Sequence, residues 1–131
     1  MILIVGGRGQ GQTEYAKQCL NSLNESKADG FCIVDGEIDD PKSAIGADLV
    51  LNLHGFVRSV MKAGGDPRAF TRELLESAPE IVTIDEVGCG IVPIDAFECE
   101  YRDEAGSAGQ LLASHADQVI RMICGIPQRI R

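Results

Sequence analysis

The 131-residue sequence lacks the features that define several classes of protein. No apolar run approaches the length of about eighteen residues that a membrane-spanning helix needs, so we expect no membrane span. Basic residues are few, since 12 lysines and arginines stand against 20 acids, for a net charge of −8. Proteins that bind nucleic acid present a basic surface, and this balance therefore argues against such a partner.

Cysteine usage excludes two further kinds of architecture. The five cysteines are odd in number and include no C-x-x-C pair, which argues against both a disulfide framework and a zinc site. Reduced thiols are typical of a cytoplasmic protein, and that is the location we expect.

The pattern of apolar residues predicts a single α/β domain over residues 1–131. The predicted strands are Ile2–Val5, Phe31–Val34, Leu49–Leu53, Glu80–Ile84 and Val119–Cys124, with a short edge strand at Gln128–Arg131. Helices are predicted at Thr13–Leu23, from near Gly55 to Gly64-Gly65, from Asp66-Pro67 onward, and within Ala96–His115. Strands that are apolar on both faces favour a mostly parallel sheet of about five to six strands, with helices on both faces and ligands at its carboxyl edge.

The segment between the first strand and the first helix has the frame of a phosphate-binding loop, G-x-x-x-x-G-K-[ST]. Its glycines allow backbone N–H groups to turn around an anion, and its last hydroxyl stands where Mg²⁺ would be bound. We therefore predict a P-loop NTPase-like fold that binds a nucleoside triphosphate, GTP or ATP. The nucleotide-binding candidates are Gly6, Gly7, Arg8, Gly9, Gln10, Gly11, Gln12 and Thr13, and Thr13 is also a candidate Mg²⁺ ligand.

One position of this loop departs from the motif. Gln12 stands where a lysine would contact the β- and γ-phosphates, so the loop favours triphosphate binding and argues against triphosphate chemistry. Arg8 is the nearest cation that could compensate, and the alternative is that its side chain points to solvent.

A second candidate site follows the fourth predicted strand. This strand ends in Asp85 and Glu86, the general Walker B pattern, in which the first acid holds Mg²⁺ and the second orients or activates a nucleophile. The alternative is a strand that ends in acids because it reaches solvent. In combination with the glycine loop we favour the first interpretation, with Asp85 and Glu86 as catalytic candidates and Asp85 as a Mg²⁺ ligand.

A longer motif continues from Glu86. Residues 86–93 read E-V-G-C-G-I-V-P and residues 101–106 read Y-R-D-E-A-G. Together with the glycine loop, these segments resemble the bifunctional adenosylcobinamide kinase / adenosylcobinamide-phosphate guanylyltransferase family, CobU. The resemblance extends to Gly125-Ile126 and is poor in the middle of the chain.

This resemblance implies a role in assembly of the nucleotide loop of cobalamin. Enzymes of the family phosphorylate adenosylcobinamide, a corrinoid, and then transfer GMP from GTP through a covalent histidine intermediate. The resemblance also implies a homo-oligomer, which is a trimer in the family.

Three departures from the family pattern bear on activity. Gln12 replaces the loop lysine, and Asn52 stands where the family has an acid. The segment that carries the guanylylated histidine in the family corresponds to Asp35–Asp48, which contains none. We interpret His54 and His115 as ordinary polar surface or helix-end residues, with ligand contact at His54 as the alternative. The family usually has a neutral residue before its glutamate, so Asp85 would restore the acid lost at Asn52.

Two hypotheses of different kinds follow. The first is a nucleotide-dependent adenosylcobinamide kinase that lacks the guanylyl transfer step. The second is a non-catalytic relative that binds nucleotide or corrinoid, or partners a complete enzyme. An unrelated small P-loop protein is a third and more distant alternative.

Overall fold

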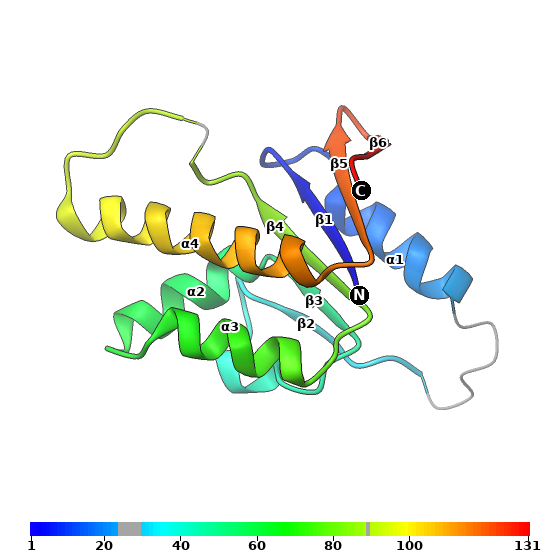
Figure 1. Cartoon of the computed structure of the whole chain (residues 1–131), viewed down its shortest axis with the longest axis horizontal. Helices are drawn as coiled ribbons and strands as arrows, with labels where there is room; N and C mark the ends of the chain where they lie inside the picture. Colours follow the sequence, from blue (N-terminus) through cyan, green and yellow to red (C-terminus); the bar gives the residue numbers. More distant parts are fainter. Residues whose placement is uncertain (24–29, 89) are drawn as a thin grey trace.

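The computed structural model describes residues 1–23, 30–88 and 90–131 (Figure 1). Its strands are β1 (Ile2–Gly6), β2 (Ile33–Asp35), β3 (Leu49–Leu51), β4 (Ile81–Asp85), β5 (Gln118–Ile123) and β6 (Ile126–Arg129). Its helices are α1 (Gln12–Leu23), α2 (Leu53–Lys62), α3 (Pro67–Glu76) and α4 (Ala96–His115), with a short 3₁₀ turn, η1, at Pro41–Ala44. In these residues no helix has the length and apolar character that crossing a membrane would require.

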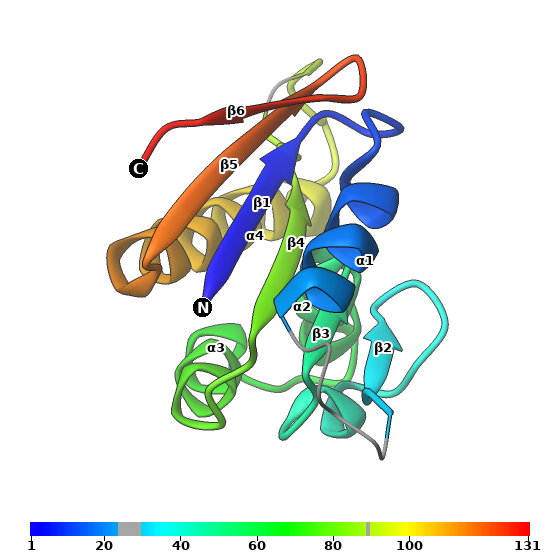
Figure 2. The same cartoon turned by 90° about the vertical axis from the view of Figure 1, so that its right-hand side faces the viewer.

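All the strands belong to one sheet in the order β2-β3-β4-β1-β5-β6. The first five run parallel, and β6 pairs antiparallel with β5 at one edge. Two layers of apolar side chains cover the sheet. On one face Ile4 and Ile81 pack with Leu20 of α1, and on the other Leu3 and Val82 pack with residues of α2, α3 and α4. Figure 2 shows α1 on the opposite side of the sheet from α3 and α4. The prediction of an α/β, P-loop-like fold with helices on both faces is confirmed.

Local signals place two of the helix starts. The Asp66 carboxylate accepts a hydrogen bond from the backbone N–H of Arg68 at 2.9 Å, and Pro67 follows as the first helical residue of α3. Asp95 caps α4 in the same way, at 3.1 Å from the N–H of Glu98. The first of these contacts explains why the start predicted at Asp66-Pro67 is confirmed, and the helix predicted within Ala96–His115 fills that whole range.

The junction of β3 and α2 differs from the prediction. The strand expected at Leu49–Leu53 ends at Leu51, and the helix expected near Gly55 already begins at Leu53. Asn52 between them has φ +52°, a left-handed conformation that asparagine tolerates better than most residues. Its backbone N–H donates to Thr83 Oγ1 at 2.9 Å. The abrupt turn brings the start of α2 directly over the carboxyl edge of the sheet.

Smaller shifts occur elsewhere. The second strand, expected at Phe31–Val34, lies at Ile33–Asp35, and the edge strand expected at Gln128–Arg131 lies at Ile126–Arg129. Four of the cysteines are described and have free thiols, namely Cys19, Cys32, Cys99 and Cys124. Cys89, which belongs to the motif at residues 86–93, lies outside the described residues.

Candidate functional site

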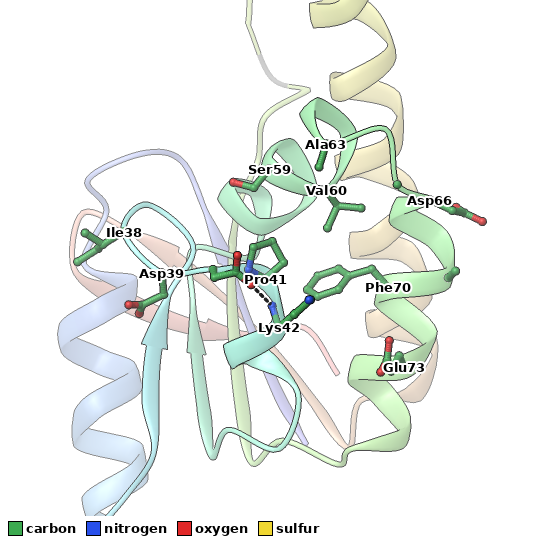
Figure 3. Close-up of a pocket in the computed structure, with 13 residues that line it drawn as sticks. Ile38, Asp39, Pro41, Lys42, Ser59, Val60, Ala63, Asp66, Phe70 and Glu73 are labelled. Carbon is green, nitrogen blue, oxygen red and sulfur yellow. Dashed lines mark hydrogen bonds between the residues drawn. The ribbon is translucent and has the colours of Figure 1, made fainter.

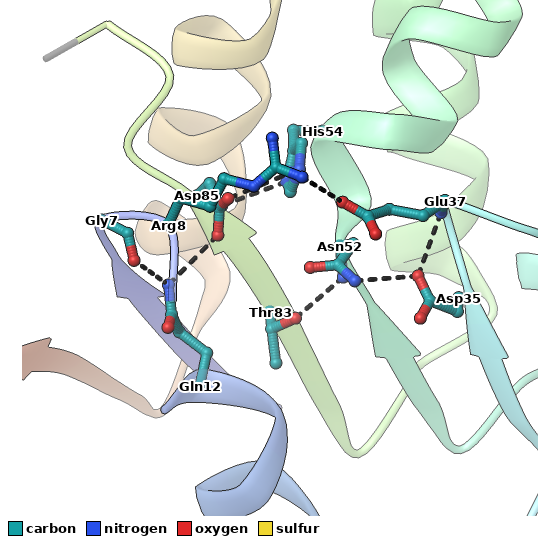
Figure 4. A network of polar contacts seen from close by, with 9 residues as sticks. All are labelled: Gly7, Arg8, Gln12, Asp35, Glu37, Asn52, His54, Thr83 and Asp85. Carbon is teal, nitrogen blue, oxygen red and sulfur yellow. Dashed lines mark hydrogen bonds and ion pairs between the residues drawn. The ribbon is translucent and has the colours of Figure 1, made fainter. Parts of the chain in front are cut away.

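The glycine loop and the acid that ends β4 lie side by side at the carboxyl edge of the sheet. β1 and β4 are neighbours, and their register pairs Gly6 with Asp85. The first turn of α2 and the loop after β2 complete the site, so four segments that are distant in the sequence meet there (Figure 4). Ligands bind at this edge in parallel α/β sheets.

The loop has the open backbone that phosphate binding requires. Gly9 and Gly11 have φ of +72° and +94°, conformations that favour glycine. The β5–β6 turn supports the loop, because the Cys124 N–H donates to Gln10 Oε1 at 2.7 Å and the Gly125 N–H donates to the Gln10 carbonyl at 3.0 Å. No acceptor within the described residues takes the backbone N–H of Gly11 or Gln12. These donors are therefore available to an anion at the start of α1.

The neutral side chain of Gln12 fills the position of the motif's lysine. Gln12 is only 6% exposed, and its Nε2 donates to the Gly7 carbonyl at 2.8 Å and to Asp85 Oδ1 at 3.1 Å. The amide therefore links the start of α1 to the loop residue Gly7 and to Asp85 at the end of β4.

His54 occupies the other side of the Asp85 carboxylate. Its Nδ1 accepts the backbone N–H of Asp85 at 3.2 Å, and its Nε2 lies 3.6 Å from Asp85 Oδ2. Because Nδ1 is the acceptor, the proton of the neutral ring is on Nε2. Burial lowers the pKa of His54, although the charge of Asp85 opposes the shift. Burial likewise raises the pKa of Asp85, and the charges of His54 and Arg8 oppose that change.

The interpretation of His54 as an ordinary surface residue is therefore wrong, since its side chain is 12% exposed and lies within the site. Its position at a helix end is confirmed, because His54 is the second residue of α2. The only sequence signal was its position just after a strand, at the edge where ligands bind. His115 is an exposed residue at the end of α4, where Nδ1 contacts the Leu111 carbonyl at 3.0 Å. The helix-end interpretation of His115 is confirmed.

A second polar cluster holds the loop that follows β2. Asn52 Nδ2 donates to Asp35 Oδ1 at 2.8 Å, and the same oxygen accepts the Glu37 N–H at 3.0 Å. Arg8 reaches across the mouth of the site, with Nη2 3.9 Å from Glu37 Oε1. Its side chain is 88% exposed, so it lies in solvent and carries a positive charge beside the glycine loop.

Two glycines that the sequence analysis did not single out allow this packing. A Cβ at Gly55 would lie 2.3 Å from the Gly36 carbonyl oxygen, and a Cβ at Gly36 would lie 2.2 Å from the Asn52 carbonyl oxygen. The loop after β2 therefore packs backbone to backbone against the first turn of α2. This contact fixes Glu37 and His54 relative to each other.

The Glu86 side chain points away from the loop, although its backbone N–H donates to the Gly6 carbonyl at 2.8 Å. Its carboxylate accepts two hydrogen bonds from Arg121 of β5, at 2.7 and 3.0 Å. Successive side chains point to opposite faces of a strand, so Glu86 faces the α4 side, whereas Asp85 faces the loop. The structure therefore places only the Asp85 side chain at the glycine loop, and the Glu86 side chain lies elsewhere.

A cavity of about 280 Å³ opens at the loop. It is lined by one cation and three acids, together with loop and polar residues: Arg8, Gly9, Gly11, Gln12, Thr13, Glu14, Glu37, Asn52 and Asp85.

The donor atoms in this cavity fit a Mg²⁺ ion that arrives with a nucleotide. The Thr13 hydroxyl makes no hydrogen bond to any described residue, and Thr13 and Asp85 line the same cavity. Hydroxyl and carboxylate oxygens suit Mg²⁺, which binds through one or two protein groups and completes its shell with phosphates and water. Within the described residues no group of three or more His, Cys, Asp or Glu side chains could hold a metal. The fit is therefore to a metal–nucleotide complex.

A larger groove of about 750 Å³ lies between η1, α2 and α3 (Figure 3). Pro41, Val60 and Phe70 contribute apolar surface, and Asp66 and Glu73 contribute acids. The loop after β2 contributes to both hollows, with Glu37 in the cavity and Ile38 in the groove.

A glycine loop and an acid at the carboxyl edge of a mostly parallel sheet are the features of a P-loop-like α/β protein. The chain belongs to the CobU family, described as cobinamide kinase / cobinamide phosphate guanyltransferase, whose sequence profile matches residues 55–130. This family has a role in cobalamin biosynthesis and consists of nucleotide-binding transferases. The matched segment begins at Gly55, directly after His54, and includes Asp85. The glycine loop lies before the matched segment. A search of the curated proteins found no match to the chain.

Proposed function

We propose that this chain is a nucleotide-dependent kinase of cobalamin biosynthesis that phosphorylates adenosylcobinamide and does not transfer guanylyl groups. The observation that carries the proposal is that Thr13 and Asp85 line one cavity at the open N–H groups of the glycine loop. In such a site catalysis consists of positioning the phosphates and neutralising charge.

In this proposal each group around the cavity has one task. The N–H groups of Gly11 and Gln12, at the positive end of α1, bind the phosphates of GTP or ATP. Thr13 and Asp85 hold the Mg²⁺, which supplies the charge that stabilises the transferring phosphoryl group. Arg8 adds a second positive charge at the mouth. The groove beside the loop after β2 is the candidate surface for the corrinoid.

The proposal limits the protein to the first of the family's two reactions. The segment Asp35–Asp48 contains no histidine, so the family route to a covalent guanylyl intermediate has no nucleophile there. We further propose that residues 1–131 form one domain of the family. The sheet supports this, because β1 pairs with both β4 and β5, and strands from the whole length of the chain take part.

One observation favours a non-catalytic relative as the second candidate. Gln12 places a neutral amide, already bonded to Gly7 and Asp85, where the motif has a cation. Loss of one preorganised group at a developing charge typically costs about 10²–10³ in rate. Such a protein would bind nucleotide or corrinoid, or act as the partner of a complete enzyme.

Transfer of label from γ-labelled ATP or GTP to adenosylcobinamide tests the proposal. We expect transfer that requires Mg²⁺ and that falls by about 100-fold or more in Asp85→Asn. Asp103→Asn makes the same charge change at an exposed position of α4 and is expected to leave transfer unchanged.

Calorimetry with the same nucleotides separates the two candidates. Nucleotide binding without any transfer would support the non-catalytic relative. No heat at millimolar nucleotide and Mg²⁺ would contradict the proposed kinase and also nucleotide binding by the non-catalytic relative, and unchanged transfer in Asp85→Asn would contradict the role of Asp85.

A further inference from the structure

We infer that His54 is a positioning residue that holds Asp85 in the orientation in which Asp85 binds Mg²⁺. The inference rests on the proposed function, in which Asp85 is a metal ligand. It concerns a residue outside the glycine loop and outside the motif at residues 86–93.

The first argument is that His54 restrains Asp85 at two points. Nδ1 accepts the backbone N–H of Asp85 at 3.2 Å, which fixes the main chain at the last residue of β4. Nε2 lies 3.6 Å from Oδ2, so the ring also lies close to the carboxylate. Figure 4 shows the ring and the carboxylate facing each other at the mouth of the site.

The second argument is that the restraint leaves the carboxylate available. Gln12 Nε2 contacts Oδ1 from the loop side, and His54 Nε2 approaches Oδ2 from the α2 side. Each carboxylate oxygen has two lone pairs, so one contact per oxygen leaves acceptor positions for a metal. The Gln12 amide is neutral, so it orients Asp85 without cancelling the charge that attracts Mg²⁺.

The third argument is that the backbone around His54 is itself constrained. Asn52, in its left-handed conformation, turns the chain from β3 into α2, and His54 is the second residue of that helix. Gly55, the next residue, packs against the Gly36 carbonyl with no room for a side chain. The ring is therefore presented by a rigid segment, as positioning of a metal ligand requires.

Nuclear magnetic resonance of the nucleotide-free chain tests the geometry directly. We expect the ¹⁵N shifts of His54 to show a neutral ring protonated on Nε2 at pH 7.5 to 8. His54→Leu, which fills similar space without polar atoms, is expected to change the ¹³C shift of the Asp85 carboxylate. A ring protonated on Nδ1, or an unchanged Asp85 shift in His54→Leu, would overturn the inference whether or not the chain binds nucleotide.

The Mg²⁺ dependence of GTP or ATP binding tests whether the contact between His54 and Asp85 affects metal binding. We expect His54→Leu to raise the Mg²⁺ concentration for half-maximal nucleotide binding by about tenfold, the effect of losing one hydrogen bond, here the bond that Nδ1 accepts from the Asp85 backbone N–H. His54→Asn keeps an acceptor near the position of Nδ1 and is expected to remain within about threefold of the original chain. His115→Leu is the matched control at an exposed helix end and is expected to have no effect.

Each outcome decides whether His54 orients Asp85 or only fills space in the core. Full function in His54→Leu would mean that the ring only fills space, and failure of His54→Asn to restore binding would mean that the backbone contact does not matter; either result overturns the inference. Absence of Mg²⁺-dependent binding in the original chain would refute the proposed function, while the resonance experiment would still decide the geometry. Urea denaturation of each variant verifies that it is folded.

Discussion

At the scale of single residues, position 12 has the greatest consequence for nucleotide binding. The buried Gln12 amide donates to Asp85, a residue 73 positions away, and to the loop carbonyl of Gly7. It therefore stabilises the empty loop with hydrogen bonds, whereas a lysine would present a charge to the phosphates.

Gln12→Lys is expected to tighten binding of a nucleoside triphosphate by about tenfold and of the diphosphate by less, since a charge-assisted contact to the terminal phosphates is gained. Calorimetry with both nucleotides measures the two effects. Gln18→Lys adds the same charge at an exposed position of the same helix and is the control. Equal tightening for both nucleotides would show that the side chain does not reach the terminal phosphates.

At the scale of elements, the site depends on the contact between the loop after β2 and the first turn of α2. Gly36 and Gly55 permit an approach of main chain to main chain that any side chain would prevent. This contact places Glu37 opposite Arg8 and His54 opposite Asp85, so two elements that carry no recognised motif shape the cavity.

Gly55→Ala is expected to lower the free energy of unfolding by about 1–3 kcal/mol, because its methyl group overlaps the Gly36 carbonyl. Gly106→Ala on α4 meets no atom within 4 Å and is expected to raise stability by up to about 1 kcal/mol through helix propensity. Urea denaturation of the two variants measures both changes. Stabilisation by both would contradict the close approach of Gly55.

At the scale of the whole molecule, the chain has the fold of a family described as cobinamide kinase / cobinamide phosphate guanyltransferase. The net charge is −8, and the loop cavity has three acids against one arginine. A triphosphate therefore approaches a negative protein, and its binding relies on local N–H groups and on Mg²⁺. We propose that the chain does not carry out the second reaction of the family, because the segment between β2 and β3 contains no histidine.

Incubation with GTP labelled at the α-phosphate, followed by denaturing electrophoresis, is expected to leave no label on the protein. The segment between Asp35 and Asp48 has no histidine, and the His54 ring accepts the Asp85 backbone N–H at Nδ1 and lies 3.6 Å from the Asp85 carboxylate at Nε2. Acid-labile label that maps to His54 would contradict this expectation and would assign a guanylyl transfer step to a new position.

Local patterns in the sequence by themselves determined the class of fold, the position of the glycine loop and the start of α3. These features depend on residues close together in the chain: glycines that allow a left-handed backbone, the aspartate cap at Asp66, and a proline in a first turn. The motif at residues 86–93 likewise predicted the family to which the chain belongs.

The tertiary structure decided which side chains meet. β4 extends to Asp85, and alternation along the strand then turns Asp85 toward the loop and Glu86 toward Arg121, which a sequence pattern that names both acids does not distinguish. His54 joins the site because β3 ends two residues earlier than expected and β3 lies next to β4 in the sheet. Strand order and strand ends are set by packing of the whole core, so contacts between distant segments follow from the folded chain and not from local spacing.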